Sequence, residues 1–179
     1  ENIENRALLK VKTRYSNQVH VNITSYNRHV LISGEAASDA VRKGVEEEVA
    51  TVAGIKRIFN EMAIGPLAGV MAVSNDTRLT TIVKTRFLEA NRFQPNHVKV
   101  VTEAGVVYLM GIVKRSEADA AAQLASTTAG VNRVVRLFEY LESANNFFYK
   151  NTSTPDKPPA KADTETVRED LRKQISAAE

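Results

Sequence analysis

The residues of this sequence that could act in catalysis or hold a metal ion are few and lie far apart. The chain has no cysteine and three histidines, His20, His29 and His97. The lack of cysteine excludes disulfides, thiolate metal sites and a cysteine nucleophile. His20 and His97 each stand where a strand is expected to begin, and neither has a carboxylate beside it at the spacing of a metal-binding motif. We therefore interpret them as polar strand residues and predict no metal site.

The acidic residues lead to a similar expectation. Glu46, Glu47 and Glu48 follow one another in a segment whose valines recur every four positions, which is typical of the solvated face of a helix. The chain contains neither the G-x-S-x-G turn of serine hydrolases nor a glycine-rich phosphate-binding loop. These patterns predict no catalytic residue and no cofactor, so we expect a protein that is not an enzyme.

The sequence is organised as two copies of one pattern. Four segments of the first half are each matched in the second half: VKTRY 11–15 by VKTRF 83–87, HVNI 20–23 by HVKV 97–100, VLISG 30–34 by VYLMG 107–111, and VAGIKRI 52–58 by TAGVNRV 128–134. The offset changes only slightly along the chain. A self-similarity that survives small insertions indicates duplication of one structural unit.

Each copy is expected to contain the elements α-β-β-α-β. Apolar residues at helical spacing precede two short alternating runs, which predict a hairpin, and a second helical stripe then leads into a third strand. The hairpin makes the first two strands antiparallel, whereas the crossover through the second helix makes the last two parallel. The predicted fold class is α+β, with two tandem units over about 3–64 and 76–141, each a mixed three-stranded sheet with two helices on one face.

The two helices of the second copy differ in character. The later helix offers only small residues to the sheet, Ala118, Ala121, Ala122 and Ala125, which allow it to lie close. The earlier helix, expected over 77–91, places its apolar residues on one side. Its opposite side carries three cations, two threonines and one leucine: Arg78, Thr81, Lys84, Thr85, Leu88 and Arg92. A basic helix face with a single exposed leucine is common in soluble proteins.

The motifs of both copies resemble the BON domain. The second copy carries them most clearly, with Val107, Leu109 and Gly111 in the hairpin and the segment AGVNRV at 129–134 after the second helix. The stretches SNDTRLTTIVKTRF at 74–87 and VKVVTEAGVVYLMGIVKRSEADAAA at 98–122 are similar to those of dual-BON outer-membrane lipoproteins. The resemblance covers roughly residues 1–142.

The resemblance implies a lipoprotein of the Gram-negative periplasm, anchored by its N-terminus to the outer membrane and supporting envelope integrity. It also implies that the first helix of the second BON domain binds anionic phospholipid, through Arg78, Thr81, Lys84, Thr85, Leu88 and Arg92. The sequence begins at Glu1 and contains no cysteine for lipidation, so the anchor is an expectation from the family. An aromatic residue of the family is replaced here by Arg78, which would weaken interfacial anchoring.

Two other classes of function compete with this expectation. A periplasmic protein-interaction scaffold or stress protein without direct lipid binding remains open, with envelope proteins as partners. Nucleic-acid binding of the KH type requires a G-x-x-G clamp, which the chain lacks.

Composition and charge agree with a folded protein of this kind. Hydrophobic residues make up 43% and charged residues 25%, and a net charge of +3 permits anionic partners without requiring them. The apolar run at 64–73 is interrupted by proline and glycine and is too short for a membrane span, which needs about 20 residues.

The expected domains follow from the repeat and from changes in composition. The first BON domain is expected over 1–65, a packed apolar linker over 66–75, and the second BON domain over 76–143. Residues 144–179 are rich in proline, threonine and charge and are expected to form a flexible tail. Apolar residues spaced four apart leave open either a frayed polar end or a short helix over 165–176, which docks on the body or on a partner.

Overall fold

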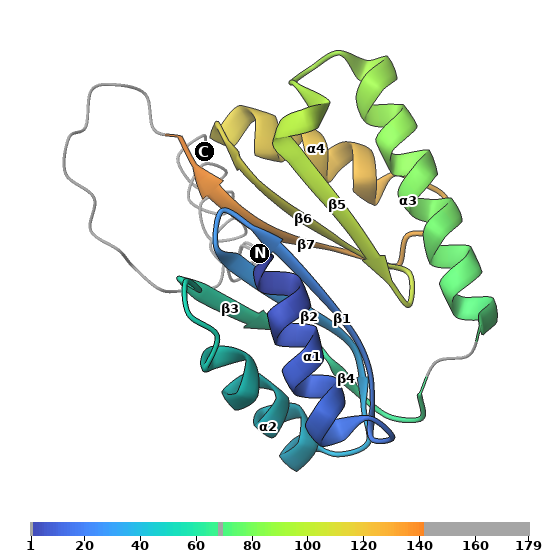
Figure 1. The fold of residues 1–179 in the computed structure, drawn as a ribbon. Coiled ribbons are helices and arrows are strands. Elements are labelled where there is room, and N and C mark those ends of the chain that lie inside the picture. Colours follow the sequence, from blue (N-terminus) through green and yellow to red (C-terminus); the bar gives the residue numbers. More distant parts are fainter. Residues whose placement is uncertain (1, 68–69, 142–179) are drawn as a thin grey trace, which may run out of the picture. The chain divides into compact units, whose positions relative to one another are not determined.

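The computed structural model describes residues 2–67 and 70–141, and Figure 1 shows the arrangement of their elements. The first copy contains α1 (Ile3–Tyr15), β1 (Val19–Tyr26), β2 (His29–Ala36), α2 (Asp39–Ala50), β3 (Arg57–Asn60) and β4 (Ala63–Ile64). The second contains α3 (Val70–Ala90), the 3-10 turn η1 (Pro95–His97), β5 (Val98–Glu103), β6 (Val106–Val113), α4 (Arg115–Ser126) and β7 (Arg133–Tyr140). The α+β fold predicted from the repeat is confirmed.

Polar side chains satisfy backbone groups where three of these helices begin. The Asn2 side chain accepts a hydrogen bond from the Glu4 N–H at the start of α1, and the Ser38 side chain accepts one from Val41 N at the start of α2. At the start of α4, the Glu117 carboxylate accepts from the Lys114 N–H at 2.8 Å. These bonds supply partners for N–H groups that have none inside a helix.

The strand directions agree with the prediction. β1 pairs antiparallel with β2, and β2 pairs parallel with β3; likewise β5 pairs antiparallel with β6, and β6 parallel with β7. The first sheet differs in one detail, because its expected third strand is divided into β3 and the two-residue β4, both parallel to β2. Between them the Asn60 side chain accepts from Met62 N, and Met62 is buried.

The start of α3 differs from the expectation. The helix begins at Val70, within the segment expected as a linker, rather than near residue 77. The linker residues Val70, Met71, Ala72 and Val73 belong to the helix, and none of them is proline or glycine, the residues that most strongly disfavour a helix interior. The predictions for 144–179, including the short helix over 165–176, lie outside the described residues.

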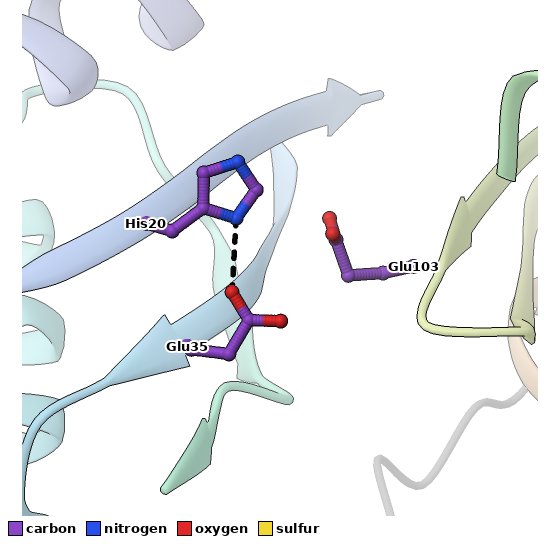
Figure 2. A group of neighbouring side chains, drawn as sticks. All are labelled: His20, Glu35 and Glu103. Atoms are coloured by element: carbon purple, nitrogen blue, oxygen red, sulfur yellow. Dashed lines mark hydrogen bonds and ion pairs between the residues drawn. The ribbon is translucent and has the colours of Figure 1, made fainter. Parts of the chain in front are cut away.

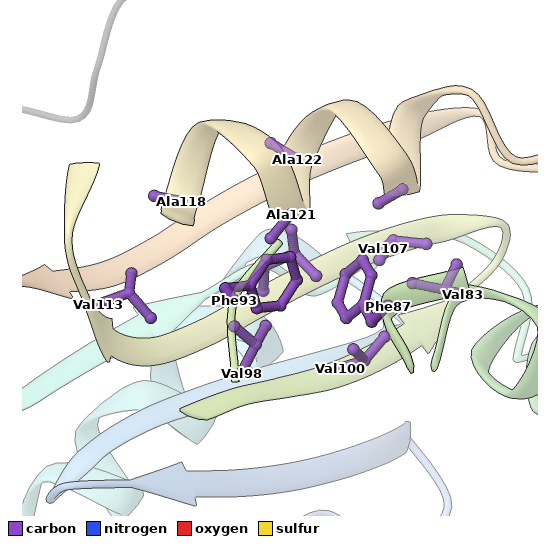
Figure 3. Close-up of a cluster of buried hydrophobic side chains, with 12 residues drawn as sticks. Val83, Phe87, Phe93, Val98, Val100, Val107, Val113, Ala118, Ala121 and Ala122 are labelled. Atoms are coloured by element: carbon purple, nitrogen blue, oxygen red, sulfur yellow. The ribbon is translucent and has the colours of Figure 1, made fainter. Parts of the chain in front are cut away.

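One face of each sheet packs against its two helices. In the second copy the core contains Val83 and Phe87 from α3, valines from the sheet and the four buried alanines of α4, as Figure 3 shows. The Phe87 and Phe93 rings meet edge to face with centroids 5.1 Å apart. The first copy has an equivalent core beneath α1 and α2. The alanine stripe of α4 is buried as predicted.

The opposite faces of the two sheets pack on each other. Leu31 of β2 shares a buried cluster with Tyr108 and Met110 of β6 and with Leu137 of β7. Successive side chains of a strand point to opposite faces, so the apolar residues at the centres of β2 and β6 are buried on both sides of the sheets. From the sequence, packing of the two copies on each other was expected, but only the faces that meet the helices were assigned.

The glycines that mark the repeated hairpin have a steric role. Gly34 pairs with Val21 across the first hairpin, and Gly111 pairs with Val98 across the second. A Cβ atom at Gly34 would overlap the carbonyl oxygen of His20, and one at Gly111 would overlap that of His97. Each copy therefore needs glycine at this position because the neighbouring strand backbone occupies the space of a side chain.

Candidate functional site

The outer face of α3 is exposed where the sequence analysis expected a binding surface. All six predicted residues are exposed: Arg78, Thr81, Lys84, Thr85, Leu88 and Arg92. The Leu88 side chain has 67% of its surface accessible, whereas Val83 and Phe87 on the opposite side of the helix are buried. We call the six exposed residues the α3 face. Its large accessible leucine stands out because an apolar side chain of this size gains by leaving water.

The cations of the α3 face differ in their surroundings. Arg78 donates to the Asn75 side chain at 3.3 Å, and Arg92 donates to the Gln123 side chain of α4 at 3.2 Å. Within the part of the chain that the structure describes, Arg78, Lys84 and Arg92 form no ion pair. Their charges are therefore available to an anionic surface.

Arg92 does not project from α3 with the other five residues of the predicted face. Arg92 lies beyond the last helical residue, Ala90, so it does not continue the helix on which the face was drawn. Its side chain is held by α4 instead of projecting from α3. The two threonines also contribute less than their hydroxyls suggest, because Thr81 and Thr85 donate back to helix carbonyls four residues earlier. Lys84 and Leu88 remain as the centre of the face.

The corresponding helix of the first copy provides an internal comparison. Leu9 on α1 is as exposed as Leu88, with 69% of its surface accessible. Beside it, however, the cations Lys10 and Arg14 lie 3.9 and 3.0 Å from the Glu48 carboxylate of α2. The cations beside the exposed leucine are paired with an acid in α1, whereas those of the α3 face are not.

Arg86 is a residue of α3 that the sequence analysis did not single out. Its guanidinium donates at 2.7 Å to the Leu124 carbonyl and to the Thr128 hydroxyl, and at 3.1 Å to the Thr127 hydroxyl. It thus binds the C-terminal end of α4, where carbonyl groups lack helical partners. The signal in the sequence was the repeated V-K-T-R motif, but the partners of the arginine could not be deduced from it.

A second group of polar side chains lies between the two sheets. Figure 2 shows His20 of β1, Glu35 of β2 and Glu103 of β5 turned toward one another. His20 and Glu35 are direct partners in the β1–β2 ladder, and the His20 Nδ1 lies 3.0 Å from a Glu35 carboxylate oxygen. The Ser33 hydroxyl donates to the Glu103 carboxylate at 3.3 Å. This group was missed from the sequence because its members are distant along the chain: His20 and Glu35 belong to the first repeat and Glu103 to the second.

Burial determines the electrostatics of this group. It raises the pKa of Glu103, and the nearby carboxylates of Glu35 and Asp76 raise it further, whereas His20 acts in the opposite direction. The buried Asp76 accepts hydrogen bonds from the Ala104 and Gly105 N–H groups at 2.7 and 2.9 Å. Asp76 therefore holds the turn that follows Glu103.

The glutamates also line a cavity of about 360 Å³. Its other walls include Arg42, Glu61 and Arg133, so both signs of charge are present. Tyr108 contributes to the wall; burial, with the Glu61 carboxylate nearby, raises the pKa of its phenol to about 12. The phenol is therefore protonated, and neutral, at physiological pH.

Both halves of the chain match one known family. The family model described as the BON domain matches residues 5–66 and 75–142. The chain is 34% identical over 140 residues to the outer membrane lipoprotein DolP of Haemophilus influenzae, covering 78% of this chain and 69% of that protein. It is 33% identical over 141 residues to the 21 kDa hemolysin of Actinobacillus pleuropneumoniae, covering 79% and 70%.

Solved structures resemble the chain only remotely. CdsD, a structural protein of the type III secretion system of Chlamydia trachomatis, is 10% identical with a TM-score of 0.33, covering 76% of this chain and 93% of that structure. None of the helices in the described residues is both long and apolar enough to cross a membrane.

With two matched domains and relatives of this similarity, the chain belongs to the BON domain family, as a tandem-BON homologue of the outer membrane lipoprotein DolP.

Proposed function

We propose that the chain is a non-enzymatic envelope protein that binds anionic phospholipid through the α3 face. The observation that carries the proposal is the exposed Leu88, which lies on the same helix face as Arg78 and Lys84, two cations without an ion pair among the described residues. We further propose that it acts at the periplasmic face of the outer membrane, held by the N-terminal lipid anchor that the family resemblance implies, and that it supports envelope integrity there.

The chemistry of the face favours a lipid surface. Each lysine or arginine near an anionic membrane contributes roughly 1 kcal/mol of attraction, and inserting a leucine into the interface adds up to about 1.5–3 kcal/mol. Neither contribution alone gives stable binding, but a cation and an apolar side chain on one helix face act together. The names of the two relatives, an outer membrane lipoprotein and a hemolysin, also associate this family with membranes.

Co-sedimentation with vesicles tests the proposal. Vesicles of phosphatidylcholine with an increasing fraction of phosphatidylglycerol should retain increasing amounts of the chain. The double variant Arg78→Glu with Lys84→Glu should lose this binding while remaining folded, because both side chains are exposed. Lys12→Glu with Lys56→Glu is the matched control in the first BON domain, where both lysines are also exposed, and it should bind like the unmodified chain.

The outcome also decides between the proposal and its main alternative. If the folded α3 variant binds vesicles unchanged, the α3 face is not the lipid site. If neither the unmodified chain nor any variant binds anionic vesicles, the alternative of a protein-interaction scaffold without direct lipid binding is favoured. Circular dichroism of each variant establishes that the fold is retained.

A further inference from the structure

We propose that His20, Glu35 and Glu103 form a binding site for a zinc ion between the sheets of the two BON domains. One ring nitrogen of His20 and one carboxylate oxygen from each glutamate all lie within 4.8 Å of one another. Imidazole nitrogen and carboxylate oxygen are ordinary zinc ligands, at about 2.0–2.2 Å from the metal, and three such ligands with a water complete a tetrahedron. This proposal does not depend on lipid binding, because no residue of the α3 face takes part.

The three ligands stand on rigid elements. His20 and Glu35 are opposite each other in the β1–β2 ladder, which directs both side chains to the same face of the sheet. Glu103 ends β5 and is held on two sides, by the Ser33 hydroxyl and by the turn that Asp76 fixes through Ala104 and Gly105. Tetrahedral ligand atoms lie about 3.3 Å apart, so the carboxylates need to approach by roughly 1–1.5 Å, which side-chain rotation supplies.

The charges of the group also favour a cation. Glu35 is buried and Glu103 is partly buried, and the Asp76 carboxylate adds a third negative group nearby. Two carboxylates that lie close together away from water repel one another. A divalent ion bound by both carboxylates relieves that repulsion. The imidazole nitrogen favours zinc over magnesium or calcium, which prefer oxygen ligands alone.

The duplication indicates that the fold does not require this group. When the repeats are aligned on Gly34 and Gly111, the position of Glu35 corresponds to Ile112 and that of Glu103 corresponds to Tyr26. His97, the counterpart of His20, is exposed and has no carboxylate opposite it in the β5–β6 ladder, where Gly111 pairs with Val98. The second copy thus keeps the architecture without the ligands.

An ion also has a route to the site. Glu35 and Glu103 line the cavity of about 360 Å³, and this volume leaves room for a coordinating water. His20 is partly exposed, with 35% of its side-chain surface accessible. The ligands therefore combine burial, which favours coordination in a low dielectric, with access from solvent.

Calorimetric titration of the full chain with zinc chloride, in metal-free buffer without vesicles, tests this site. One zinc ion should bind per chain. His20→Gln and Glu103→Gln should each weaken binding about tenfold or more, because each removes a ligand while keeping a side chain of similar size. The matched controls are His97→Gln, at the equivalent position of the other repeat, and His29→Gln, whose Nδ1 lies 3.6 Å from a carboxylate oxygen of Glu139. Both should bind zinc like the unmodified chain.

Two further measurements separate ligand loss from misfolding. Zinc should shift the His20 ring signals in NMR spectra of the unmodified chain and leave those of His97 in place. It should also raise the melting temperature of the unmodified chain but not that of folded Glu103→Gln. The proposal is overturned if zinc does not bind below about 1 mM, where affinity is already weak, or if folded His20→Gln binds it with unchanged affinity. Equal binding of magnesium would also overturn it, since that indicates an acidic patch without a role for the imidazole.

Discussion

The Lys99 ammonium of β5 lies 3.0 Å from a carboxylate oxygen of Glu4 in α1, which joins the second BON domain to the first helix of the chain. The same Glu4 carboxylate accepts a hydrogen bond from the Ser25 N–H at 2.6 Å, and Lys99 donates to the Ser25 carbonyl at 3.2 Å. Three elements, α1, β1 and β5, therefore meet at one partly buried charge pair.

The stability contributed by Glu4 should depend on pH. Burial by itself would raise the pKa of Glu4, but the Ser25 N–H and the Lys99 ammonium outweigh it and hold the pKa below its ordinary value of 4.5. The unfolded chain therefore takes up this proton first as the pH falls, so the contribution is complete above pH 4.5 and is lost below it, through the folded-state pKa. The free energies of unfolding in urea of the unmodified chain and of Glu4→Gln should differ by about 1 kcal/mol at pH 7 and converge as the pH falls through the folded-state pKa. A difference between the two free energies of unfolding that does not change with pH would contradict this prediction.

Alanine at either hairpin glycine should destabilise the fold. Gly34→Ala and Gly111→Ala would each drive a methyl group into the carbonyl of a histidine on the neighbouring strand. We expect each to lower the free energy of unfolding by about 2 kcal/mol or more, with the larger loss at Gly34, whose φ of +111° is also unfavourable for alanine. Gly65→Ala is the control, since no atom lies within 4 Å of its added Cβ, and it should change stability by less than about 0.5 kcal/mol. If Gly34→Ala and Gly111→Ala were as stable as the unmodified chain, the hairpin strands would have to accommodate the added methyl group without a loss of free energy.

A glutamate substitution should affect vesicle binding on the exposed side of α3 and folding on its buried side. Leu88→Glu should weaken vesicle binding and leave the circular dichroism spectrum unchanged, because the side chain is 67% exposed. Val83→Glu should unfold the second BON domain, since Val83 is fully buried and an unpaired charge there has no partner. If Leu88→Glu instead abolished folding, or bound vesicles normally, Leu88 would not have the role proposed for it.

Salt should weaken the proposed binding to vesicles. The cations of the α3 face are exposed, so added ions screen their attraction to anionic headgroups. Between about 50 and 300 mM sodium chloride the Debye length falls from roughly 14 to 6 Å, and the bound fraction should fall with it. Retention that is independent of salt would indicate that burial of Leu88, rather than charge, accounts for the affinity.

The contact between the sheets should make the two BON domains unfold together. Leu31 is fully buried in the cluster formed by residues of both sheets, and Leu31→Ala should cost about 2–5 kcal/mol. In the unmodified chain, amide signals from β2 and from β6 should disappear at the same urea concentration, because each sheet covers a buried face of the other. Separate midpoints in the unmodified chain would indicate two independent domains.

The sequence by itself determined what depends on local pattern. Period-two and period-four spacings place the hairpins and the helices, and the matching segments identify two copies of one unit. Apolar residues at helical spacing identify which side of each helix is buried, and the exposures of Val83 and Leu88 agree with that prediction. The start of α3 was wrong by several residues because helix boundaries depend on weak local preferences.

The tertiary structure alone decided which polar residues meet. His20, Glu35 and Glu103 are polar residues in strands. From the sequence, each is equally consistent with a side chain that faces solvent and with one that contacts another polar group. They come together because the free faces of two sheets pack, which spacing along one strand cannot reveal. The partners of Arg92 and Arg86 were likewise decided by the closeness of α4, which its buried alanines permit. Periodicity reports which face of an element is apolar, whereas the identity of the opposing surface arises only when the whole chain is packed.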